Sequence, residues 1–443
     1  MTDAFAVATF ESDATPTVGD PIAYGTVEGV DDPLSCRGVV LYPDGLPIVL
    51  ATIDWIGLYH GGYDEFRTAL ADAAGTTPER VAIHTVHQHE APGFDATTET
   101  MLYGHGVEAF RVEPGFARET IRAAADAVRA ATPKPCTHVG CGTAEVEGVA
   151  SNRQVLGPDG TCCYVRYTSG GSDFEFAQRA PEGIIDPELV AVGFWDQNEP
   201  IAALTYYATH PQSYYRNGLV TCDFPGIARN QRQTETGVHH VHFTGAAANV
   251  TAGKYNDGSQ ERRPILADRV AAGMRSAWEG ATPIPVSGDE VGWTVERVAL
   301  PPSEDLDRAE LVAGIAEESP GPPARGLAWL RRCELGHRIP ITGLELPDAT
   351  VLHLPGEPFV EYQLAARAID DERTIAVAGY GDGGPGYLPT RAAFPMGGYE
   401  VDVAKVDPAV ESALRDAIEG VVGGEMGEHT PSAITETKPR TER

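Results

Sequence analysis

His84, His87 and His89 lie close together, where a β-branched segment gives way to a Pro-Gly pair. We expect residues 81–86 to form a buried strand. Because strand side chains alternate between faces, His87 and His89 are expected to project to one side and His84 to the other. Neutral imidazole is a preferred ligand of zinc, so His87 and His89 can converge on one metal ion. The alternative is that both satisfy hydrogen bonds in a polar turn.

His210 and Glu357 each follow an apolar segment, so both are also expected at strand ends, and a proline follows each directly. The proline after Glu357 is expected to open a helix over residues 359–368. Glu357 is therefore a candidate metal ligand. Its alternative function is to complement the positive end of that helix, which contributes about 0.3 to 1 kcal/mol.

The amino-acid composition excludes some classes of partner. The 443 residues carry 64 acidic and 33 basic side chains, for a net charge of -31, and only four of the cations are lysines. Such a charge repels the phosphates of nucleic acids and anionic membrane surfaces. It is typical of proteins that stay dissolved in high salt, so we expect a halophilic source.

No apolar segment reaches the roughly 20 residues needed to span a bilayer, and the first residues do not form a secretion signal. We therefore expect a cytoplasmic protein without transmembrane segments. From about residue 423 onward, Gly, Glu, Thr, Lys and Pro dominate, which predicts a disordered tail over residues 423–443.

Short apolar segments alternate with helical patterns along the chain, which predicts an α/β fold. Two hairpins are expected, the first between segments 37–42 and 47–54 and the second between segments 189–195 and 201–208. Helices are predicted over residues 62–74, 115–131 and 264–278.

Four of these segments together resemble the neutral, non-lysosomal ceramidase family. The sequence HQHEAPG at 87–93 resembles the family motif HTHSxPG, and ATH at 208–210 resembles its second histidine segment. LPGE at 354–357 is similar to its PGE motif, and GYLPT at 386–390 with YE at 399–400 is similar to its two-tyrosine segment. The four segments follow the family order, and the likeness extends from about residue 19 to about residue 401.

The resemblance implies a single large mixed-sheet catalytic domain flanked by helices, over residues 1–422. It also implies a zinc amidohydrolase, with Zn²⁺ bound by four residues: His87, His210, Glu357 and Tyr387. Such a set leaves a position for water, whose pKa zinc lowers toward about 7.

Further site residues are implied by the same resemblance. His89 is expected to contact the substrate or to stabilise the tetrahedral oxyanion, and Tyr399 to donate a hydrogen bond to the same oxygen. The segment SNR at 151–153 is similar to the family segment NxNR, which places Arg153 opposite the developing negative charge. The alternative for Arg153 is a structural ion pair.

The chain departs from the family at two places. The family segment GDxSPN corresponds to residues 248–253 here, where Thr251 replaces the serine and Asn249 the carboxylate. This favours direct attack by metal-activated water over a covalent mechanism, and leaves Thr251 as either a participant or a turn hydroxyl. Glu90 replaces the small residue after the two histidines and is a candidate for proton transfer if it is buried.

The substrate is expected to be a small molecule. A linear amide such as a soluble N-acyl compound is the first expectation, because the chain shows no interfacial helix for a membrane lipid such as ceramide. An esterase or lactonase is the alternative, and a non-catalytic binding protein with a degenerate site is another. His239, His240 and His242 leave a second metal site open, and the sequence does not reveal the oligomeric state.

Overall fold

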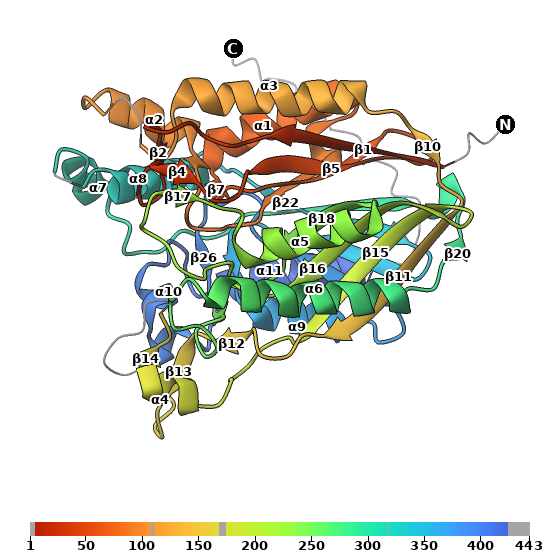
Figure 1. Cartoon of the computed structure of the whole chain (residues 1–443). Helices are drawn as coiled ribbons and strands as arrows, with labels where there is room; N and C mark the ends of the chain where they lie inside the picture. Colours follow the sequence, from red (N-terminus) through yellow and green to blue (C-terminus); the bar gives the residue numbers. More distant parts are fainter. Residues whose placement is uncertain (1–4, 108–109, 168–173, 318, 424–443) are drawn as a thin grey trace, which may run out of the picture.

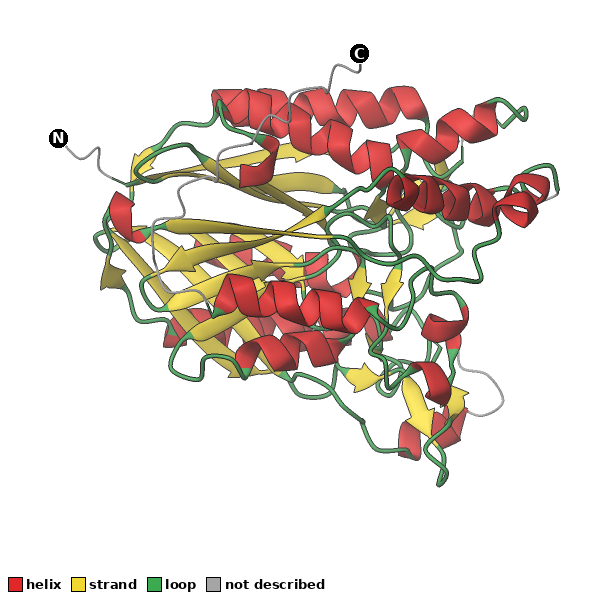
Figure 2. Cartoon of the chain, turned by 180° about the vertical axis from the view of Figure 1, so that it is seen from behind, coloured by secondary structure: helices red, strands yellow, loops and turns green. Residues whose placement is uncertain are grey.

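The structure of the chain is a computed structural model that describes residues 5–107, 110–167, 174–317 and 319–423. Three large β-sheets lie in the middle, and helices cover their outer faces (Figure 1; Figure 2). Each sheet combines antiparallel and parallel pairs, so the predicted mixed-sheet α/β architecture is confirmed. Except for Gly423, the predicted tail lies outside the described residues and stays a prediction.

The first sheet is buried on both faces, which explains its nearly continuous apolar sequence. In β6, Val49, Ala51 and Ile53 pack on the side of the covering helices, whereas Ile48 and Leu50 pack toward the other two sheets. The strand period of two thus divides one apolar segment between two cores. The strand order is β10 (Lys134–Pro135), β1 (Ala6–Asp13), β5 (Ser35–Tyr42), β6 (Ile48–Ile53) and β8 (Val81–Thr85).

The other two sheets meet the first in a shared core that includes Phe194, Phe243 and Leu344. The second sheet has the order β18 (His239–Thr244), β16 (Glu199–Tyr207), β15 (Glu188–Asp196), β11 (His138–Glu145) and β20 (Ile284–Pro285). The third has the order β21 (Gly292–Val298), β22 (Ile339–Leu346), β23 (Ala349–His353) and β25 (Thr374–Ala378).

Each sheet contains one strand-helix-strand unit with parallel strands. The pairs are β6 with β8, β16 with β18, and β23 with β25. Their connecting helices are α1 (His60–Ala74), α5 (Asp223–Thr236) and α9 (Val360–Arg367). Residues that follow the carboxyl ends of such strands are placed to form ligand sites.

Further helices complete the outer layers. Helix α3 (Pro114–Ala130) lies beside α1 on the first sheet, and α6 (Arg262–Gly280) lies beside α5 on the second. Helix α11 (Val410–Val422) covers the third sheet, while α2 (Ala96–Tyr103), α7 (Arg308–Gly314) and α8 (Gly321–Glu334) pack together at one end. Two short helices, α4 (Phe174–Arg179) and α10 (Tyr399–Asp402), belong to the loops.

The predicted hairpins and long helices are confirmed. Strands β5 and β6 pair in antiparallel register, as do β15 and β16. Helix α1 ends where Gly75 takes the left-handed conformation with a φ of 69°. The local signals were strong at these places because turn residues and apolar periods agree.

The predicted helix after Glu357 is confirmed, but it begins one residue later than predicted. Glu357 and Pro358 form the short strand β24 (Glu357–Pro358), which pairs in parallel with β26 (Tyr387–Leu388). Phe359 is the N-cap, and α9 begins at Val360. Pro358 therefore lies in a strand pair and not in the first turn of the helix.

None of the helices in the described part of the chain combines the length and the apolarity that crossing a membrane requires.

Asp54 and Arg229 form an ion pair in which both side chains are fully buried. Arg229 donates to the two carboxylate oxygens over 2.7 and 3.0 Å. Burial raises the pKa of Asp54, but Arg229, Arg37 and Ser35 outweigh this and lower it below its usual value. The pair connects the end of β6 to α5 and so fixes the first sheet against the second.

We expect Asp54→Ala to lower the free energy of unfolding by about 3 to 5 kcal/mol, because it leaves the Arg229 guanidinium buried without its partner. Denaturant unfolding at constant ionic strength measures this. The double variant Asp54→Leu with Arg229→Met is the control and should recover most of the loss. A loss below about 1 kcal/mol in the single variant would contradict the assigned importance of the pair.

Candidate metal centre and the cavity beside it

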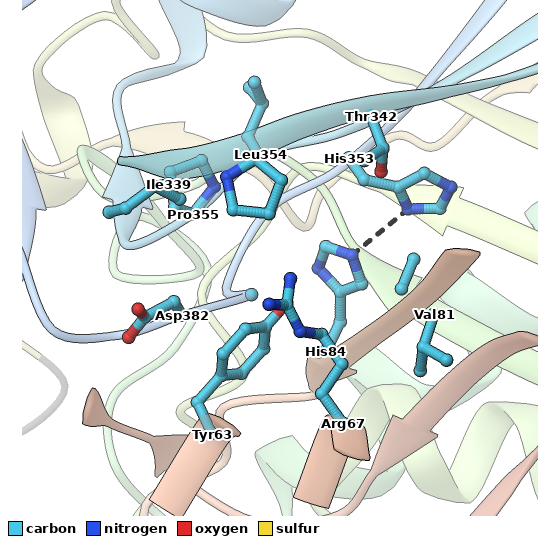
Figure 3. A pocket seen from close by; sticks show the side chains of 13 residues that line it. Tyr63, Arg67, Val81, His84, Ile339, Thr342, His353, Leu354, Pro355 and Asp382 are labelled. Carbon is cyan, nitrogen blue, oxygen red and sulfur yellow. Dashed lines mark hydrogen bonds between the residues drawn. The ribbon is translucent and has the colours of Figure 1, made fainter. Parts of the chain in front are cut away.

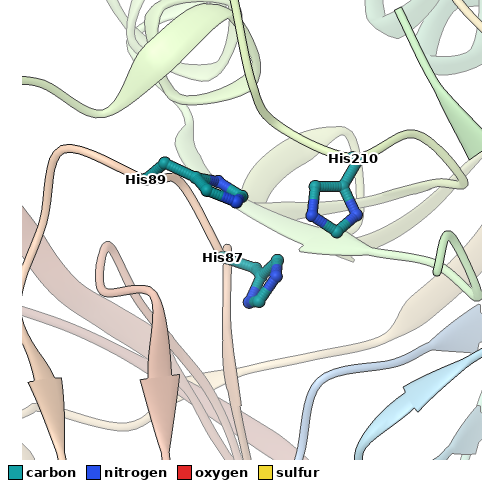
Figure 4. A group of neighbouring side chains, drawn as sticks. All are labelled: His87, His89 and His210. Atoms are coloured by element: carbon teal, nitrogen blue, oxygen red, sulfur yellow. The ribbon is translucent and has the colours of Figure 1, made fainter. Parts of the chain in front are cut away.

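Three buried imidazoles meet at the carboxyl ends of two of the strand-helix-strand units. His87 and His89 follow β8, and His210 follows β16 (Figure 4). The ring centroids are 4.7 Å apart for His87 and His210, and 5.2 Å apart for His89 and His210. One nitrogen of each ring lies within 4.8 Å of the others, which is close enough for one metal ion. The sequence prediction that these histidines come together is confirmed.

The route by which His87 and His89 converge differs from the prediction. Strand β8 ends at Thr85, and His87 has a φ of 77°, in the left-handed region. The strand alternation therefore does not reach these residues. The reversal at His87 instead turns the loop into the site, where its ring lies 5.4 Å from that of His89.

A backbone carbonyl fixes the protonation of His87. Nδ1 lies 2.5 Å from the carbonyl oxygen of Ile56, so Nδ1 carries the proton and donates it. The Nε2 atom then presents a lone pair to the site. Ile56 is held in turn by its amide, which donates to the Pro92 carbonyl over 2.8 Å, so both sides of this loop are fixed.

His210 is held in a similar way. Its amide donates to the Val250 carbonyl over 2.9 Å, and its Nδ1 lies 3.3 Å from the Ala247 carbonyl and 3.2 Å from the Tyr380 hydroxyl. Its Nε2 is buried and has no hydrogen-bond partner. Burial lowers the pKa of His210 well below its usual range, and Arg153 and the neighbouring imidazoles lower it further. Burial likewise lowers the pKa of His89, so both rings are neutral.

Glu357 completes the constellation from the third strand-helix-strand unit. Its Oε2 lies 3.4 Å from Nε2 of His87, and this buried oxygen has no hydrogen-bond partner. Positive charge satisfies both atoms, whether it is a proton on Nε2 that makes them an ion pair or a metal ion that lies between them. Two ligands of a tetrahedral zinc ion with bonds of about 2.0 to 2.1 Å are separated by roughly 3.3 Å. The donor set and its spacing therefore fit a metal ion.

The β24–β26 pairing sets Tyr387 directly opposite Glu357. Burial raises the pKa of Tyr387 well above its usual range. Arg153 contacts Tyr387, with 3.4 Å between Nη1 and the phenolic oxygen. Arg153 also pairs with the buried Glu400 over 3.2 Å, so the structural ion pair expected as its alternative is present beside its place at the site. The Tyr399 ring lies 5.7 Å from Tyr387, which places it at the same cavity.

Glu90 is buried, as its predicted function requires, and it contacts a loop that the sequence did not indicate. Its carboxylate accepts hydrogen bonds from the amides of Arg216, Asn217 and Gly218 and thereby holds that loop. Burial raises the pKa of Glu90 above its usual value, although these amides lower it. Glu90 therefore anchors the loop, and its function in proton transfer stays a prediction.

Backbone pairing places Thr251 beside His210. It forms an isolated parallel bridge with His210 and pairs with Ser151 between β19 (Val250–Thr251) and β12 (Ser151–Asn152). Asn249 supports the same turn, because its side chain donates to Glu361 and accepts from the amide of Val360, each over 2.9 Å.

The other histidines of the described residues do not join a ligand cluster. In the part of the chain that the structure describes, His87, His89 and His210 form the one group of three close ligand atoms. His242 contacts Thr205 over 3.0 Å and His240 contacts Thr236 over 3.2 Å, so nothing supports a second metal there.

His84 lies within β8 and lines a separate small cavity (Figure 3). Its Nδ1 donates to the Gly379 carbonyl over 2.6 Å, and its Nε2 lies 3.1 Å from Nδ1 of His353. Both of its nitrogens are therefore engaged away from the metal centre.

A cavity of about 520 Å³ opens beside the metal centre and includes His87, His89 and Glu357 in its wall. Sequence reasoning missed several residues around it: Tyr24, Tyr59, Arg111, Arg325, Tyr380 and Lys405. They occur singly on distant segments, without a motif or spacing to mark them. The ring of Tyr380 stacks on His87 with 4.3 Å between the centroids. Its backbone has a φ of 61°, in the left-handed region, which the sequence does not predict.

The fold is that of the neutral ceramidases. The chain is similar to the crystal structure of neutral ceramidase from Pseudomonas aeruginosa, with a TM-score of 0.69 and 17% identity over 94% of this chain and 73% of that one. It is also similar to a structure described as ceramidase complexed with C2, with a TM-score of 0.68 and 15% identity over 97% and 77% of the two chains. No protein-family model matches the sequence, and no curated protein does. The resemblance seen in the sequence is thus confirmed in the fold.

We expect the purified chain to bind one transition-metal ion per molecule. His87→Ala or His210→Ala should lower the affinity by more than the roughly 10- to 100-fold typical of residues that only orient a ligand. His84→Ala is the matched control and should bind normally, since His84 lies in the other cavity. Elemental analysis and competition with a chromophoric chelator measure both quantities. Unchanged binding in both ligand variants would contradict the site.

We also expect the bound metal to persist as the pH falls from 7.5 to about 6. The metal binds neutral imidazole, and the lowered pKa values of His89 and His210 keep these rings neutral through the usual titration range of histidine. Dialysis at each pH followed by elemental analysis tests this. Loss of half the metal near pH 6.5, as expected for exposed histidines, would contradict it.

Proposed function

We propose that this chain is a zinc-dependent hydrolase that cleaves the C–N bond of a linear amide. The observation that carries the proposal is the opposed pair of buried atoms, Nε2 of His87 and Oε2 of Glu357, beside the unpartnered Nε2 of His210. The likeness in fold to neutral ceramidases supports the choice of an amide.

His87, His210, Glu357 and Tyr387 would hold the zinc ion. Neutral nitrogen ligands with one carboxylate are typical of catalytic zinc sites that keep a position for water. When bound, zinc polarises a carbonyl and makes water a nucleophile near neutral pH. His89 lies close enough to the same ion to be a further ligand, or to contact the substrate as the sequence resemblance implies.

The protein groups around this centre would stabilise the charge that develops on the carbonyl oxygen. Arg153 brings a buried cation whose second partner, Tyr387, lies at the centre. The Tyr399 hydroxyl would donate a hydrogen bond to the same oxygen. The ring of Tyr24 stacks on His89 with an interplanar angle of 4°, and Tyr215 lies 5.2 Å from His89. These aromatic rings would exclude water around the substrate carbonyl.

Tyr399→Phe should lower kcat for an N-acyl substrate by about 100-fold with little change in KM, because the hydrogen bond strengthens only in the transition state. Tyr103→Phe is the matched control, since Tyr103 is an exposed tyrosine outside the cavity wall. Steady-state kinetics on the zinc-loaded enzyme measures the effect. A variant as active as the parent would remove Tyr399 from the mechanism.

The reaction itself is tested with matched N-acyl amides and esters of the same acyl chain. Hydrolysis of the amide that a chelator abolishes and zinc restores supports the proposal. Cleavage of the ester or a lactone alone would replace it by an esterase or lactonase. Zinc binding without any hydrolysis would instead support a non-catalytic binding protein.

A further inference from the structure

The cavity beside the metal centre has a cationic wall. Arg111, Arg325 and Lys405 line it together with His87 and Glu357. They come from three distant segments: the loop before α3, helix α8 and the loop before α11. Two guanidinium groups and one amine, the pKa of which burial lowers to about 7, surround this cavity in a chain whose net charge is -31.

Within the described residues, the two guanidinium groups have no ion-pair partner. The side chains of Arg111 and Arg325 form no hydrogen bond with these residues, and the Nε atom of each is buried without a partner. Arg325 lies over the ring of Tyr59, with 4.3 Å from Cζ to the ring centroid. Other buried arginines do have carboxylate partners, as Arg229 has Asp54 and Arg153 has Glu400.

The positions of these cations are fixed. The carbonyl of Arg111 accepts from the amide of Gly93 over 3.2 Å, which ties it to the loop that carries His87 and His89. Lys405 donates from Nζ to the Gly384 carbonyl over 2.6 Å and so reaches the loop that leads to Tyr387. The cationic wall is therefore built onto the same loops as the metal centre.

Asp95 and Glu357 both act electrostatically on Arg325, and Glu357, which lies in the cavity wall, also acts on Arg111. In the proposed function the charge of Glu357 is engaged by zinc, which adds positive charge to the same space. The guanidinium groups are half-buried and have free donors, and a bound carboxylate or other oxyanion forms strong hydrogen bonds with such groups. The wall is thus complementary to an anion.

The rest of the wall is apolar and includes Leu306, Leu311, Pro322 and Pro323. A ligand that fills the cavity therefore needs both an apolar part and an anionic group. We propose that the substrate is an amide that carries an anionic group, such as an N-acyl amino acid, and that Arg111 and Arg325 bind this group while the apolar wall contacts the acyl chain. The amide in this statement rests on the proposed function, whereas the anion rests on the cavity alone.

The test compares N-dodecanoylglycine with N-dodecanoylglycinamide, which has a neutral carboxamide in place of the carboxylate. Their dissociation constants are measured by calorimetry on the metal-free protein at fixed ionic strength, so that the carboxylate does not bind zinc. N-dodecanoyltaurine, a sulfonate, is the third ligand. We expect the glycine or the taurine conjugate to bind at least about tenfold more tightly than the neutral amide, and the better of the two identifies the anion.

Variants then assign the preference to the two arginines. The double variant Arg111→Gln with Arg325→Gln should bind the charged and neutral ligands about equally. The control Arg275→Gln with Arg297→Gln removes the same charge from exposed positions and should keep the parent preference. Arg325→Gln alone covers the case in which the double variant does not fold, and should lose a clear part of the preference.

Equal binding of the three ligands to the parent, no binding of any, or a preference that survives in the arginine variants would each overturn the inference. Measuring hydrolysis by the zinc-loaded enzyme distinguishes failure of this inference from failure of the proposed function. Anion preference without hydrolysis leaves the inference standing and rejects the hydrolase. Hydrolysis of both amides with equal kcat/KM and equal affinity supports the hydrolase and rejects the inference of an anionic substrate.

Discussion

The site depends on one electrostatic constraint: an imidazole nitrogen and a carboxylate oxygen face each other and require positive charge between them. Nε2 of His87 and Oε2 of Glu357 lie 3.4 Å apart, and Nδ1 of His87 donates to the Ile56 carbonyl, so Nε2 is the nitrogen that faces the carboxylate. A metal ion between the two atoms accepts a lone pair from each of them at once. The contacts of His210 with Ala247 and Tyr380 orient its Nε2 atom toward the same point, and the contact of Tyr387 with Arg153 orients the phenolic oxygen toward it.

Chain topology explains how ligands that are hundreds of residues apart reach that point. Each large sheet contributes one parallel strand pair, and the loops after those strands meet at one edge of the molecule. The short β24–β26 pairing then brings Tyr387 to Glu357, and the β7–β9 pairing (Gly57–Leu58 with Gly93–Phe94) brings the Ile56 segment to His87. Each extended loop is therefore fixed by backbone hydrogen bonds rather than by its own sequence. This is why the site is rigid although most of its residues lie outside long strands and helices.

The sequence reveals those parts of the fold that local patterns determine. The apolar segments of β5 and β6, the glycine that ends α1, and the histidines at strand ends all carry signals that act within a few residues. The reversal at His87 and the strand pairing of Glu357 depend on partners far along the chain, so no local pattern contains them. Glu90 shows the same limit, since the loop at 216–218 that its carboxylate holds lies distant in the sequence.

The cationic cavity is the feature that the sequence predicts least well, and it has the largest consequence for the choice of substrate. Arg111, Arg325 and Lys405 are single residues in an acidic sequence, and only the fold shows that they face one space. The acidic surface repels an anionic ligand at long range, but salt screens such repulsion over about 8 to 10 Å at moderate ionic strength. Contacts inside the cavity are screened much less. High salt therefore weakens the barrier to approach more than it weakens the contact itself, so an acidic exterior and a cationic binding site are compatible in one protein.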